Sequence, residues 1–125
     1  MGMESTLCDG RGWVHQALEE MDPGFDFTLR NGWPRASVEG EAVFWGEHSN
    51  TSTDLAVVDE VSYFVVLRAR DWDRLWELSE AVNQALLELG LRRQYASPDE
   101  FDEGYCTKTF RFGRKIDKRF MRLVD

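Results

Sequence analysis

The side chains that most often carry out chemistry are few in this chain and stand far apart. The histidines are His15 and His48, and the cysteines are Cys8 and Cys106. A catalytic or zinc-binding residue usually has a partner at a characteristic spacing, as in HExxH, CxxC or GxSxG, and the sequence contains none of these motifs. We therefore expect no catalytic residue, no metal site and no cofactor. Cys106 is expected to be a small buried hydrophobe.

A short acidic run, formed by Asp99, Glu100, Asp102 and Glu103, is a second candidate for chemistry. Closely spaced carboxylates can bind calcium, but an EF-hand loop needs ligands at every second position, a central glycine and a bidentate glutamate at its end. The run lacks this spacing. We interpret it as a solvated loop, or as an interface that meets a basic surface.

The charge of the chain is divided unequally along its length. Residues 105–125 hold seven basic and two acidic side chains, a net charge of +5, whereas residues 1–104 carry −13 of the total of −8. The acidic body argues against nucleic-acid binding, because phosphate recognition needs Lys and Arg to release counterions. The basic end is either a solvated strand face or one half of a head-to-tail contact with the acidic run of a neighbouring subunit, through Arg111, Arg114, Lys115 and Lys118.

Four tryptophans could serve as recognition residues. Trp72 and Trp76 lie on the apolar stripe of a helix, so we expect them in the core. Trp33 and Trp45 flank expected loops and are the better candidates for a protein interface, where Trp is enriched.

Periodicity predicts the elements that must position these residues. Apolar residues at three- and four-residue spacing predict a helix over residues 10–22, and alternation predicts a strand over 25–29. A second strand is expected over 41–47, followed by a polar loop over 48–54 and a long central strand over 57–70.

The second half of the chain begins with its most regular pattern. A helix is predicted over residues 72–89, with Asp71 as N-cap and Gly90 in the left-handed position that ends it. Residues 96–104 are predicted to be an acidic loop, residues 105–114 a strand, and residues 116–124 a further short strand.

Length and composition indicate one domain over residues 1–125, with 42% hydrophobic and 13% aromatic residues. We expect residues 1–9 to be a flexible N-terminal arm and 115–125 a flexible basic segment. No run approaches the roughly 18 apolar residues of a membrane span, so no membrane association is expected. The expected fold class is α+β: a mostly antiparallel sheet of four or five strands with two helices packed on one face, in the order α-β-β-β-α-β.

Several phrases of the sequence together resemble a known family. Residues 44–50 and 58–66 read like a strand, a loop and a central strand; residues 86–93 read like the end of a second helix; residues 98–103 match an acidic loop, and residues 104–112 a last strand. In this order they resemble the tail terminator, or tail completion, proteins of long-tailed phages and prophages. The resemblance covers about residues 42–114.

The resemblance implies a structural protein without enzymatic activity. Such a protein forms a ring, typically of six subunits, that caps the tail tube and presents the joining surface for the head. Its expected partners are itself and other tail or head-connector proteins, with no nucleic acid and no small-molecule substrate. It would be found in the cytoplasm of the bacterial host during assembly and then in the virion tail. The alternative is a small acidic binding or immunity-type protein that neutralises a basic partner.

Overall fold

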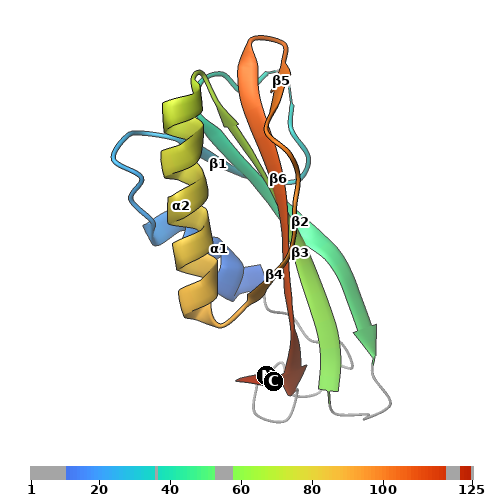
Figure 1. Ribbon diagram of the computed structural model, residues 1–125. Coiled ribbons are helices and arrows are strands. Elements are labelled where there is room, and N and C mark those ends of the chain that lie inside the picture. The colour runs from blue at the N-terminus through green and yellow to red at the C-terminus, as the bar shows by residue number, and fades with distance from the viewer. Residues whose placement is uncertain (1–10, 36, 53–57, 118–121, 125) are drawn as a thin grey trace.

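The computed structural model describes residues 11–35, 37–52, 58–117 and 122–124, which form two helices and one sheet (Figure 1). The expected α+β class is confirmed. In chain order the elements are α1 (Arg11–Glu20), β1 (Thr28–Asn31), β2 (Ala42–Ser52), β3 (Val58–Ala69), α2 (Trp72–Leu89), β4 (Arg92–Ala96), β5 (Glu100–Asp102), β6 (Tyr105–Asp117) and β7 (Arg122–Val124).

Helix α2 has the bounds and both caps that the sequence predicts. The carboxylate of Asp71 accepts a hydrogen bond from the backbone N–H of Arg74 at 2.8 Å, which satisfies one of the donors left open in the first turn. Gly90 has a φ of 104°, a conformation that suits glycine, and its N–H donates to the carbonyl of Leu87 at 3.0 Å. These local signals are sufficient to begin and end the helix.

The strands form a single sheet with β3 and β6 at its centre. The order is β1-β2-β3-β6-β4, and the short strands β5 and β7 also pair with β6. All pairings among the described strands are antiparallel except that of β1 with β2, which is parallel. The expectation of four or five strands is therefore wrong, because seven lie among the described residues.

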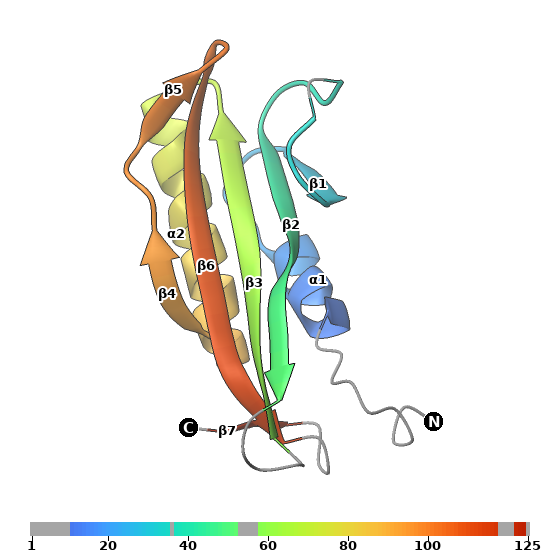
Figure 2. The ribbon, with the colours of Figure 1, turned by 90° about the vertical axis from the view of Figure 1, so that its right-hand side faces the viewer.

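Both helices pack on one face of this sheet, as expected (Figure 1). The main core lies between them and the sheet. It takes Val14 and Leu18 from α1, the row formed by Leu75, Leu78, Val82 and Leu86 from α2, and alternate residues of β3 from Val61 to Ala69. Figure 2 looks onto the opposite face, on which neither α1 nor α2 packs.

The connection between β1 and β2 covers part of this open face. A parallel pair cannot be joined by a tight hairpin, so the chain must travel back from the end of β1 to the start of β2. Val38 of this connection packs on a second small core of Ala42, Phe44, Phe64 and Val66. No sequence pattern indicates the parallel pairing, because an antiparallel meander is the simplest arrangement of three successive strands.

Three short strands share the outer edge of β6 in succession. β5 pairs with residues 105–107, β4 with 110–113 and β7 with 115–117. The prediction of a loop over residues 96–104 is wrong at Glu100–Asp102, and β4 was not predicted. Every residue of β4 and β5 is exposed, so neither strand shows the apolar alternation by which a half-buried strand is recognised.

Two other boundaries differ from expectation. β2 continues through Ser52, across the residues expected to be a polar loop, because it stays paired with β3 beyond an irregularity between Glu47 and Ser49. β6 runs on to Asp117, into the segment expected to be flexible. Strand β1 begins at Thr28, and Phe25 and Phe27 before it pack against the main core.

A glycine substitution tests the close pairing of the central strands. A Cβ at position 113 would lie 2.7 Å from the carbonyl oxygen of Val61 and 2.4 Å from Nε2 of Gln94. Gly113→Ala should lower the free energy of unfolding by about 1–3 kcal/mol, because a backbone atom must move to relieve the clash. Urea denaturation measures the change.

Gly12→Ala is the matched control for this substitution. Gly12 lies in α1 with nothing within 4 Å of an added Cβ, so the same change there should be neutral or stabilising by up to about 1 kcal/mol. Equal effects at the two positions would contradict the proposed close approach of β3 to β6.

Candidate subunit interface

The side chains of His48, Ser49 and Ser62 form a cluster that resembles a catalytic Ser–His pair but lacks the access to substrate that catalysis needs. Nδ1 of His48 lies 3.0 Å from the hydroxyl of Ser62, and the hydroxyl of Ser49 lies 2.7 Å from the same atom. A nucleophile must reach its substrate, but Ser62 is only 5% exposed. The three side chains meet where β2 changes register against β3, and we interpret them as the polar filling of that irregularity.

Among the described residues no group of three or more His, Cys, Asp or Glu side chains could hold a metal ion. His15 lies on α1, where its Nε2 is 3.0 Å from a carboxylate oxygen of Glu19 and its ring centroid is 5.7 Å from that of Trp45. Over the described part of the chain, neither helix is both long and apolar enough to cross a bilayer.

A buried arginine holds the connection between β1 and β2 (residues 32–41), which we call the crossover loop, onto the open face of the sheet. Arg68 of β3 is 8% exposed, and its guanidinium donates hydrogen bonds to the backbone carbonyls of Val38 and Gly40, the latter at 3.4 Å. The same group lies over the rings of Phe44 and Tyr105, at 5.4 and 4.4 Å from their centroids. We call this arrangement the Arg68 clamp.

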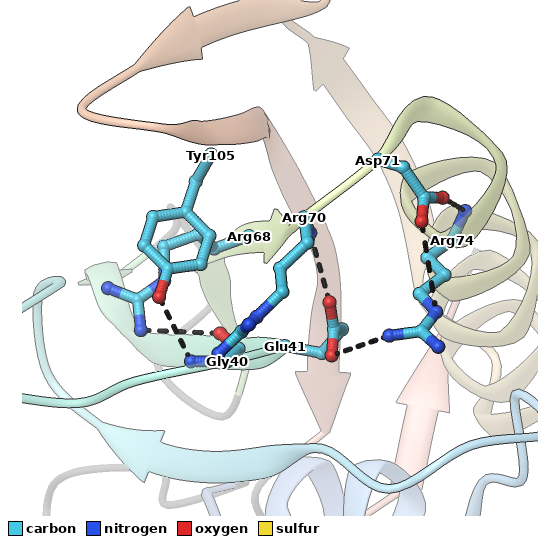
Figure 3. A network of polar contacts seen from close by, with 7 residues as sticks. All are labelled: Gly40, Glu41, Arg68, Arg70, Asp71, Arg74 and Tyr105. Carbon is cyan, nitrogen blue, oxygen red and sulfur yellow. Dashed lines mark hydrogen bonds and ion pairs between the residues drawn. The ribbon is translucent and has the colours of Figure 1, made fainter.

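Neighbouring contacts extend the clamp to α2 (Figure 3). The hydroxyl of Tyr105 accepts a hydrogen bond from the N–H of Gly40 at 3.1 Å. Glu41 accepts from the backbone N–H of Arg70 at 3.0 Å and from the guanidinium of Arg74 at 3.2 Å. Arg68, Arg70 and Tyr105 also line a hollow of about 850 Å³. Because the terminal nitrogens of Arg68 already bond the loop, we assign the clamp a structural role.

The acidic run lies at one tip of the molecule, in the hairpin that joins β5 to β6 (Figure 1). Glu100 and Asp102 are exposed in β5, and Glu103 is exposed at the turn with a φ of 51°. Asp99 precedes the strand and is bound by the ammonium of Lys108 at 2.9 Å. Three of the four predicted carboxylates are therefore gathered at the tip, and the fourth is engaged within the chain.

The predicted basic residues lie toward the other end of β6. The guanidinium of Arg111 is 5.8 Å from the ring of Tyr95, and that of Arg114 donates to the carbonyl of Gly90 at 2.8 Å, at the end of α2. Lys115 is exposed and faces Glu60 across the β3–β6 pair. Lys118 lies outside the described residues.

The acidic tip and Lys115 cannot meet within one copy. β6 contains 13 residues, and at about 3.3 Å per residue a strand of that length spans about 40 Å. The acidic tip lies at its beginning and Lys115 near its end, so charge attraction between these surfaces requires a second molecule.

The tryptophans are distributed differently from the sequence prediction. Trp33 is 62% exposed, as an interface residue would be, and its ring stacks on that of Phe64 with centroids 4.0 Å apart. Trp45 is 3% exposed in the main core, so its assignment to an interface is wrong. Trp72 and Trp76 are 48% and 67% exposed, so their assignment to the core is also wrong.

Helical geometry explains the error on α2. The core row of α2 follows i, i+3, i+7 and i+11 from Leu75, and the two tryptophans lie on the adjacent row. The sequence prediction drew the apolar stripe too wide and merged the two rows. A narrower apolar stripe, limited to the row of Leu75, Leu78, Val82 and Leu86, would have left Trp72 and Trp76 outside the core.

The row that contains Trp72 and Trp76 forms one wall of a groove, which we call the α2 groove. Its volume is about 480 Å³, and its other wall is made by β4, the segment after it and β6. The lining is Trp72, Leu75, Trp76, Ser79, Glu80, Asn83, Leu87, Arg93, Ala96, Asp99, Lys108 and Phe110.

No protein-family model matches this chain, and no curated protein matches it significantly.

The Arg68 clamp can be tested by removing its donors. Arg68→Met keeps a long apolar side chain but leaves carbonyls of the crossover loop without their partner, so the free energy of unfolding should fall by about 2–3 kcal/mol. Denaturation measures the loss, and hydrogen exchange should rise in the loop around Val38 and Gly40.

Arg70→Met is the control, because Arg70 is two residues from Arg68 in sequence but exposed. It should change stability by no more than about 0.5 kcal/mol. If the two variants were equally stable, the clamp would have no structural role.

The buried thiol gives a prediction about pH. Burial raises the pKa of Cys106, and the carboxylates of Asp71 and Asp99 add to this effect. Because the thiol ionises less readily in the folded state than in the unfolded chain, the protonated thiol contributes to the free energy of unfolding. This contribution is complete below the pKa of the unfolded thiol, about 8.5, and is lost as the pH rises through the folded pKa.

In a Cys8→Ser background, Cys106 should therefore react slowly with a disulfide reagent at neutral pH and quickly in denaturant. Cys106→Ala should lose less stability than its parent as the pH rises above about 8.5. Rapid modification of the native protein would contradict the burial of this thiol.

Proposed function

We propose that this chain is a structural subunit of a phage-type tail, a tail terminator that forms a ring with copies of itself. The ring would cap the tail tube and present the joining surface for the head. Its partners are then other copies of the chain and neighbouring tail or head-connector proteins. It acts without catalysis, in the host cytoplasm during assembly and afterwards in the virion tail.

The observation that carries the proposal is the separation of opposite charges along β6. Glu100, Asp102 and Glu103 lie at the tip where the strand begins, and Lys115 is exposed near its end. Attraction between two different surfaces of identical molecules allows a head-to-tail contact, which generates a ring when the rotation closes.

The distribution of exposed aromatic residues supports the same role. Trp33, Trp72, Trp76 and Phe101 are all at least 48% exposed, on a domain of 125 residues. Trp and Phe are enriched in protein interfaces, and exposing several of them is unfavourable unless a partner covers them. The sequence resemblance to tail terminators over residues 42–114 then selects a tail ring from among the possible assemblies.

Charge reversal tests the head-to-tail contact. Lys115→Glu should weaken self-association, and higher ionic strength should weaken it in the unmodified protein, because both reduce the attraction between the basic end and the acidic tip. Sedimentation velocity over a concentration series at two salt concentrations measures both effects. Addition of the protein to growing tail tubes should stop their elongation.

The matched control is Arg30→Glu, which makes the same change in net charge at an exposed residue of β1. Its self-association should stay close to that of the unmodified protein. A chain that remains monomeric at high concentration and does not join tail tubes would refute the proposal. A tight one-to-one complex with a basic protein would instead favour an immunity-type binding protein.

A further inference from the structure

The α2 groove carries exposed apolar surface that the fold itself does not use. Trp72 and Trp76 are exposed as given above, and Leu87 at the other end of the row is 51% exposed. A central aromatic anchor surrounded by polar groups is the usual composition of a binding hot spot. The groove therefore has the composition of a docking surface.

Phe101 extends this surface toward the acidic tip. It lies opposite Cys106 in the β5–β6 pair, and directly opposed residues of paired strands lie on the same face of the sheet. Cys106 belongs to the main core beneath the helices, so Phe101 is on the helix-bearing side. Its side chain is 66% exposed.

The helix that bounds the groove is acidic, and we call its exposed carboxylates the acidic rim. Glu80 lines the groove itself, and Asp73, Glu77 and Glu88 are exposed elsewhere on α2. The basic groups that line the groove already have partners: Arg93 donates to the side-chain carbonyl of Asn83 at 3.1 Å, and Lys108 donates to the carbonyl of Ser97 and to Asp99. The one basic residue of α2, Arg74, bonds to Glu41. An occupant should therefore bring positive charge.

We propose that the α2 groove receives the basic end of a second copy of this chain. The chain itself supplies the complementary charge, because residues 105–125 carry a net +5 against −13 in the remainder. Lys115 is exposed at the end of β6, whereas Trp72 begins α2 near the opposite end of the sheet (Figure 1). This inference rests on the proposed function and extends the acidic surface that the basic end contacts from the acidic tip along α2.

The contact has two parts with different roles. Trp76 and its neighbours supply the apolar area that determines how long the contact lasts, since truncation of a buried anchor mainly raises the dissociation rate. The acidic rim and the basic end orient the two copies as they approach. Both parts must be altered separately to test the surface.

Trp76→Ala tests the apolar part. Its exposed side chain leaves the fold intact, which circular dichroism verifies, and the dissociation constant for self-association should rise by on the order of tenfold. Tyr95→Ala removes an aromatic side chain that is 47% exposed on the face opposite the helices, the face of Phe64, and should weaken association much less. The reverse order of effects would overturn the inference.

A charge exchange tests the polar part. Glu80→Lys and Lys115→Glu should each weaken association by on the order of tenfold at low salt, and the double variant should recover most of the loss because both surfaces exchange sign. Losses that simply add in the double variant would overturn the pairing of these two surfaces.

The outcomes separate this inference from the proposed function. If the unmodified protein does not self-associate, both fail. If it associates and the variants of the α2 groove associate equally well, the proposed ring is retained but the assignment of the groove to a second copy is overturned. The occupant of the groove would then be another protein.

Discussion

The rest of the fold depends most on the contacts that the guanidinium of Arg68 makes with the crossover loop. The parallel pairing of β1 and β2 requires a connection that crosses the open face, and a crossing chain brings backbone carbonyls against the sheet. Arg68 supplies donors to these carbonyls from the centre of the sheet, and its flat cation lies over the rings of Phe44 and Tyr105. One side chain thus attaches the loop and allows a charged residue to be buried in a strand.

This attachment determines which surfaces remain available to a partner. The helices cover one face of the sheet and the crossover loop covers part of the other. Surfaces left at the margin of these layers are the acidic tip, the end of β6 and the α2 groove. Each is formed by regular elements or by a tight hairpin, so their relative positions are fixed by the sheet.

Sequence reasoning succeeded where a residue's role is decided by its near neighbours. The bounds and caps of α2 follow from Asp71, Gly90 and the spacing of apolar residues between them. β3 was likewise predicted, because a long run of apolar and β-branched residues suits a central strand covered on both faces. The acidic run was expected to be solvated, and its residues are exposed, although Glu100–Asp102 form a strand and not a loop.

It failed where a residue's role is decided by distant partners. β4 and β5 are strands only because β6 offers them backbone hydrogen bonds, and their own side chains are all exposed. Trp45 is buried because α1 packs over it, and no local sequence pattern indicates that contact. The α2 groove depends on how far the helix is rotated on the sheet, which periodicity gives only coarsely.

The division of one sheet edge among β5, β4 and β7 has a consequence for how copies can join. A long, continuous edge strand invites unlimited addition of further strands and leads to fibres. Here the described edge changes strand twice along β6, and the segment between β4 and β5 contains Pro98, which has no N–H to donate. Backbone pairing therefore offers no template for endless growth, and assembly is left to side chains whose geometry can close on itself.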